Sequence, residues 1–124
     1  MAARAAGAVT LMLVAFSFKA KAGKEREFEQ LLNNPEAGRS VARAMGATRN
    51  VLFLKDGRMI RVFEFPDGAK PVPLTEIAQR DPSVKAFLRA LGPLIEDGFD
   101  MDRPETLEAF NRRVFYPQAF DVKV

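Results

Sequence analysis

The sequence contains no cysteine, no histidine and no tryptophan, and only one tyrosine. Without cysteine the chain forms no disulfide bond and offers no thiol nucleophile, which suits a reducing compartment and predicts a cytoplasmic protein. Without histidine it lacks the usual proton shuttle and the side chain that most often binds zinc or iron. A Gly-rich phosphate loop and a dinucleotide fingerprint are also missing, so we expect neither a metal nor another cofactor.

Length and charge indicate a single domain. A chain of 124 residues has room for one hydrophobic core, and 48% hydrophobic with 28% charged residues is ordinary for a globular protein. The net charge of +3 comes from lysines and arginines scattered among nearly as many acids, which argues against nucleic-acid binding. No run approaches the roughly 20 apolar residues that span a bilayer, so we expect no membrane partner.

The start of the chain divides into two parts. Residues 1–8 are Ala-rich and are expected to be a disordered leader before one domain over residues 9–124. Residues 9–18 are apolar, and the basic residues around them leave a signal peptide as an alternative. We favour a buried first strand, because β-branched and aromatic residues recur in this stretch.

The centre of the sequence predicts a β-hairpin over residues 50–65. An Asp-Gly pair at 56–57 separates two apolar runs, and both residue types tolerate the positive φ of a type I′ turn. Side chains alternate between the faces of a strand, so Arg61 and Phe63 should share one face, with Glu64 on the other. Both faces are mostly apolar, which favours a sheet covered on both sides.

Helical patterns flank this hairpin. We expect helices at 24–32, 39–45, 82–91 and 104–113, a helical turn or two at 74–79, and a closing strand at 114–116 or 120–122. The order βαββαβ predicts an α+β, ferredoxin-like antiparallel sheet with helices on one face and an extra late helix. An apolar open face favours a homodimer in which two sheets pack together.

Four stretches resemble the SchA/CurD-like family of bacterial aromatic polyketide and spore-pigment gene clusters. They are residues 46–53, 61–64, 78–94 and 109–113. Their order and spacing also look like the tetracenomycin-type polyketide cyclases, in which a Val-Phe-Tyr run closes the chain, as at residues 114–116. The resemblance covers about residues 10–122. It implies a dimeric ferredoxin-like fold with a pocket between helices and sheet for a polycyclic aromatic or poly-β-ketone ligand.

The chain departs from the resembled enzymes at their pocket residues. Arg61 stands where the second hairpin strand of the tetracenomycin-type cyclases carries a histidine, and Asn50 stands where they have an arginine. The tryptophan typical of anthrone oxygenases is absent as well. The chain therefore has no histidine that could assist enolisation of the substrate.

Arg61, Asn50 and Glu64 are the candidate catalytic residues. The Arg61 guanidinium would stabilise an oxyanion that develops during aldol closure, or it forms a structural salt bridge or a solvated edge. The Asn50 amide would donate to a carbonyl or an oxygen species, or it is simply a polar strand end. A buried Glu64 would act as a general base, and the alternative is an ion pair with an arginine across a dimer.

The candidate substrate-binding residues are Arg49, Phe16, Phe63, Phe87 and Tyr116. Aromatic walls suit a flat polycyclic ligand, although packing in the core or an interface explains each phenylalanine equally well. Arg49 and Asn50 are adjacent in one strand, so only one of them can share a pocket with Arg61. The single tyrosine would donate to a carbonyl or merely pack. Asn111 and Arg112 would form a lid or a solvated helix face.

The resemblance implies a cyclase or aromatase that directs ring closure of an aromatic polyketide intermediate by positioning and enolate stabilisation. A first alternative is a cofactor-independent, anthrone-type monooxygenase, in which the carbanion of the substrate reacts with oxygen. A second is a non-catalytic accessory protein or chaperone whose partners are components of a polyketide synthase.

Overall fold

The computed structural model describes residues 11–124, so the leader expected at residues 1–8 and the start of the expected first strand lie outside the described residues. One antiparallel sheet forms the base of the structure, in the strand order β2-β3-β1-β4. The strands are β1 (Leu11–Lys19), β2 (Arg49–Lys55), β3 (Arg58–Pro66) and β4 (Phe115–Tyr116). Residues 11–18 thus belong to a strand, as we preferred.

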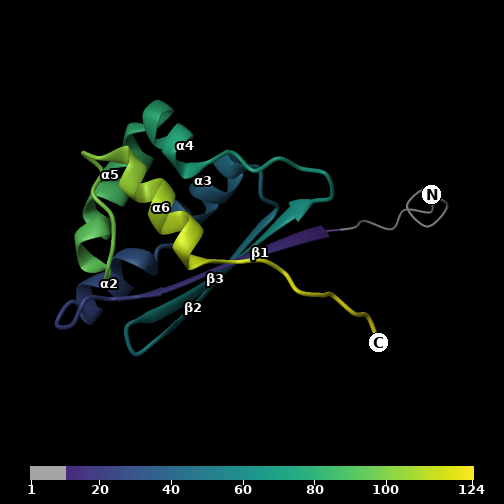
Figure 1. Ribbon diagram of the computed structural model, residues 1–124, viewed down its shortest axis with the longest axis horizontal. Helices are drawn as coiled ribbons and strands as arrows, with labels where there is room; N and C mark the ends of the chain where they lie inside the picture. The colour runs from purple at the N-terminus through teal and green to yellow at the C-terminus, as the bar shows by residue number, and fades with distance from the viewer. Residues whose placement is uncertain (1–10) are drawn as a thin grey trace.

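The helices occupy the two crossovers of this sheet. They are α2 (Glu25–Leu32), α3 (Pro35–Met45), α4 (Leu74–Arg80), α5 (Pro82–Leu91), the 3-10 turn η1 (Gly92–Leu94) and α6 (Pro104–Val114). Figure 1 shows them gathered on one face of the sheet, which confirms an α+β fold with helices on a single face. No helix within residues 11–124 has the length and apolar character needed to cross a membrane.

The hairpin between β2 and β3 forms as the sequence predicts. Asp56 and Gly57 have φ values of 50° and 76°, and Lys55 pairs with Arg58, so two residues make the turn. Glu29 of α2 accepts a hydrogen bond of 2.7 Å from the Gly57 N–H, which ties the turn to the helix layer.

The faces of β3 alternate as expected. Phe63 and Phe65 are buried beneath the helices, whereas Ile60 is 44% exposed on the other face. No helix of the described chain packs on that second face, so the expectation of a sheet covered on both sides is wrong for a single chain.

Helix α3 starts earlier than the helix that we expected at residues 39–45. It begins at Pro35, four residues before the expected start, because Asn34 caps it by accepting a hydrogen bond of 3.1 Å from the Ala37 N–H. Asn, Pro and Gly near residue 35 suggest a loop, but Asn followed by Pro is also the usual start of a helix. Its end at Gly46, with φ of 88°, is as expected.

The end of the chain needs a second correction. Val114 completes α6, only Phe115–Tyr116 forms the closing strand against β1, and residues 120–122 belong to no strand of the structure described here. Two residues suffice because β4 is an edge strand that pairs with Ala15 and Phe16 alone. Figure 1 shows the remaining residues running away from the helix layer.

An aromatic cluster joins the sheet to the helices. Phe18 of β1 meets Phe28 of α2 and Phe110 of α6 edge to face, with ring centroids 5.8 Å and 5.1 Å apart. Phe28 is fully buried, and burying a side chain of this size contributes about 2–3 kcal/mol. The cluster fixes the helix layer above β1 and β3, where the candidate site lies.

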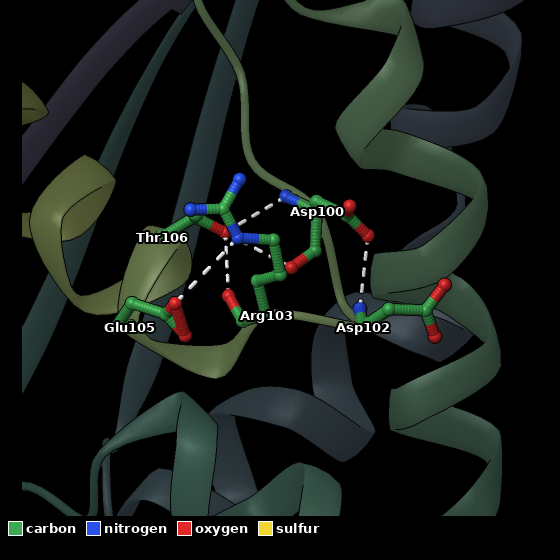
Figure 2. Close-up of polar contacts among 5 residues, drawn as sticks. All are labelled: Asp100, Asp102, Arg103, Glu105 and Thr106. Carbon is green, nitrogen blue, oxygen red and sulfur yellow. Dashed lines mark hydrogen bonds and ion pairs between the residues drawn. The ribbon is translucent and has the colours of Figure 1, made fainter.

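Side-chain hydrogen bonds hold the acidic loop before α6, shown in Figure 2. The Thr106 hydroxyl accepts from the Asp100 N–H at 2.9 Å and lies 2.7 Å from the Arg103 carbonyl, to which it donates. The Asp100 carboxylate accepts from the Asp102 N–H at 2.9 Å. These polar groups order the loop and the first turn of α6.

Candidate active site

A cavity of about 290 Å³ lies between the sheet and the helix layer. Phe16 and Phe63 line it from β1 and β3, and Phe87 lines it from α5. The three candidate phenylalanines therefore surround one space. Most other lining residues are aliphatic or aromatic, and the polar side chains among them are Arg61 and Asn111.

Arg61 is the one ionisable side chain that lines this cavity. It projects from β3 on the same face as Phe63, whose ring centroid lies 6.0 Å from the guanidinium carbon. Its Nε atom is buried without a hydrogen-bond partner, and Arg61 forms no ion pair among residues 11–124. Burial lowers the pKa of Arg61 to about 10, so the side chain remains a cation at neutral pH.

Asn50 lies diagonally from Arg61 on the same face of the hairpin, because Asn50 pairs with Phe63 and Leu52 pairs with Arg61. Its Nδ2 group donates a hydrogen bond of 3.0 Å to the Gly38 carbonyl of α3. Its Oδ1 atom is buried and has no partner. In the part of the chain that the structure describes, the Asn50 acceptor and the Arg61 donor are the only buried side-chain polar atoms left unpaired.

A second, open cleft of about 910 Å³ adjoins the cavity. Arg61 and Leu32 line both spaces, so the Arg61 side chain lies at their boundary. Helix α3 also contributes to both, with Val41 and Met45 at the cavity. Four arginines line the cleft and no acidic side chain does; they are Arg39, Arg43, Arg49 and Arg61.

The structure brings Asn50, rather than Arg49, to the face of Arg61. Arg49 lies on the rim of the cleft and pairs with Glu64 across the two strands at 3.4 Å. Glu64 lines neither the cavity nor the cleft, since it lies on the sheet face opposite to Arg61. The pair formed by Glu64 lies within one chain.

Tyr116 also lies away from the cavity. It pairs with Ala15 on β1 and is 58% exposed on the sheet face that the helices leave open. By contrast Asn111 of α6, considered for a lid, lines the cavity, whereas Arg112 does not. Arg39 and Arg43 were not foreseen, although their spacing of four residues on one helix was a signal that they share a face.

The arrangement combines an apolar, aromatic chamber with one fixed cation. A buried cation without a counter-ion is costly in a folded protein unless a ligand supplies the missing charge. The site can therefore bind a flat apolar molecule and stabilise negative charge on an oxygen atom that reaches Arg61. It offers no histidine, lysine or carboxylate inside the cavity for proton transfer.

Comparison with known proteins gives a family match and a similar solved structure. A family model described as "SchA/CurD like domain" matches residues 11–121. A solved structure of a NIPSNAP family protein from Agrobacterium tumefaciens str. C58 is similar, with 21% sequence identity and a TM-score of 0.47. That match covers 70% of this chain and 85% of the other. A search of curated proteins gave no significant match.

Proposed function

The chain belongs to the SchA/CurD-like domain family, and from that premise we propose that it is an aromatic polyketide cyclase. Its substrate would be a poly-β-ketone or partly cyclised intermediate held in the cavity. The observation that carries the proposal is the Arg61 cation at the wall of an aromatic chamber, which has no ion-pair partner within residues 11–124. Such a cation is complementary to an enolate, the charged species through which ring closure proceeds.

The proposed reaction is an intramolecular aldol closure. A methylene between two carbonyl groups loses a proton to water, and the resulting enolate oxygen lies against Arg61. The enolate carbon then forms a bond to a second carbonyl carbon, and the alkoxide takes up a proton from water. Loss of one water molecule completes the aromatic ring. The protein contributes by folding the chain against Phe16, Phe63 and Phe87 and by stabilising the enolate.

Water is assigned the role of base because of where the acids lie. Glu64 is on the opposite sheet face and is engaged with Arg49, and the cavity is lined by no other carboxylate. A methylene flanked by two carbonyls is already acidic, so stabilising its anion is the larger part of the catalytic task.

We also propose a homodimer formed through the open face of the sheet. Phe53, Ile60 and Tyr116 are 56%, 44% and 58% exposed there, and Val51 and Val62 are only half-buried. Apolar side chains gathered on one face of a sheet favour a self-complementary partner. In such a dimer each cavity stays on the helix side of its own chain.

Product profiling by mass spectrometry tests the function. A minimal aromatic polyketide synthase is run with and without this protein, under air and under nitrogen. A cyclase changes the ring pattern of the product in both atmospheres without adding oxygen. A change that needs air and adds oxygen mass would assign a cofactor-independent monooxygenase instead. An unchanged set of products would leave an accessory role.

A further inference from the structure

The open cleft beside the cavity carries charge that the proposed ring closure does not use. Arg39 and Arg43 line it from α3, and Arg49 lines it from β2. Arg39 pairs with Glu36 at 2.9 Å and Arg49 pairs with Glu64 at 3.4 Å. Neither acid lines the cleft, so the cleft surface itself is cationic.

Arg43 and Arg61 are the two arginines of the cleft that form no ion pair within residues 11–124. Arg43 is exposed, and no ion pair or hydrogen bond involves its guanidinium group within residues 11–124. The N-terminal end of α3 borders the same space through Asn34 and Pro35, and the positive end of a helix dipole adds to the attraction for an anion.

The cleft and the cavity meet at a shared side chain. Arg61 lines both, and its Nε donor is buried without an acceptor at that boundary. Neutral amides line the cleft beside the arginines, at Asn33, Asn34 and Asn50. A molecule that lies in both spaces would thus pass from apolar surroundings to donors and cations.

We infer that the ligand is amphipathic, with an aromatic body in the cavity and an oxyanion, a carboxylate or a phosphate, on a chain that extends into the cleft. This inference rests on the proposed function, because it uses the same cavity and deepens the description of its substrate. Arginine forms charge-assisted hydrogen bonds with both kinds of oxyanion, so the same cleft accepts either a free carboxylic acid or a ligand whose chain carries a phosphate group.

The test compares three ligands that share one ring and one chain length. Isothermal titration calorimetry measures the affinity of naphthylbutanoate, naphthylbutyl phosphate and the neutral naphthylbutanamide for the full chain. We expect both anions to bind more tightly than the amide. Arg43→Gln should weaken the anions by about tenfold and leave the amide unchanged, because only the anions lose a charge-assisted contact.

Arg26→Gln is the matched control, since Arg26 is exposed on α2 and lines neither space. It should change none of the affinities. A phosphate that binds much more tightly than the carboxylate would assign the cleft to a phosphate group, and equal affinities would assign a general oxyanion site.

Equal binding of amide and anions, an equal effect of Arg43→Gln on all three, or no binding would each overturn the inference. That failure would leave the proposed cyclase standing, because ring closure is measured separately by product profiling. Conversely, an anion preference that depends on Arg43 would persist even if the protein proved unable to direct ring closure.

Discussion

Replacing Arg61 with methionine should make the protein more stable and less active. Burial disfavours the charged form and lowers the pKa of Arg61 from its ordinary value to about 10. That difference corresponds to about 3 kcal/mol. Because the pKa of Arg61 is lower in the folded state than in the unfolded state, its charge destabilises the folded protein fully below pH 10. This destabilisation decreases as the pH rises through that value.

Methionine is apolar and similar in length, so it removes the charge without opening a large cavity. After allowance for water that reaches the boundary with the cleft, we expect Arg61→Met to raise the free energy of unfolding by about 1–3 kcal/mol. For a domain of this size the midpoint of thermal unfolding would rise by several degrees. Exposed Arg26→Met should change the free energy of unfolding by less than about 0.5 kcal/mol.

Urea unfolding at pH 7, followed by circular dichroism, measures both variants against the parent protein. Destabilisation of more than about 1 kcal/mol by Arg61→Met would refute the reasoning. It would mean that Arg61 has an anionic partner in solution, since only the loss of such a partner makes removal of a buried charge costly.

Two further predictions concern the open sheet face and a helix cap. Phe53→Glu should convert the proposed dimer to a monomer in size-exclusion chromatography with light scattering, because it places a charge on the apolar face. Ala90→Glu, at an exposed position of α5, should not, and a parent protein that is already monomeric would contradict the proposed interface. Asp81 caps α5, and hydrogen bonds from the Ser83 hydroxyl and then from the Ser83 N–H hold the pKa of this carboxyl below its ordinary value. Its contribution to stability is therefore lost as the pH falls through that lowered pKa, and Asp81→Asn should show a smaller acid loss in urea unfolding; identical acid profiles would exclude this role.

The fold was predictable where local chemistry decides it. Asp56-Gly57 strongly favours a tight turn, and Asp81 followed by Pro82 and by apolar residues at helical spacing predicts a helix start. The start of α3 was missed because Asn34 and Pro35 suit a loop as well as a cap, and the choice depends on whether the next turn packs on the sheet. The closing strand depends on pairing with β1, about a hundred residues away, which no local pattern specifies.

The candidate site was predictable in part for the same reason. Alternation along β3 places Arg61 with Phe63, and alternation along β2 makes Asn50 and Arg49 exclusive alternatives. Which of the two shares the face of Arg61 follows from the hairpin register. The position of Tyr116 outside the cavity follows from the register between β4 and β1, and the position of Arg43 in the cleft follows from how α3 packs on the sheet. Strand register and helix packing are features of tertiary structure, which local sequence patterns do not specify.

The central claim is that Arg61 stabilises an enolate during ring closure, and one comparison tests it most directly. A minimal aromatic polyketide synthase is run under nitrogen with the parent protein, with Arg61→Met and with Arg26→Met, and the products are profiled by mass spectrometry. The account predicts that the parent protein and Arg26→Met give the same redirected ring pattern, while Arg61→Met gives the pattern of the synthase alone. Redirection that persists in folded Arg61→Met would contradict the claim.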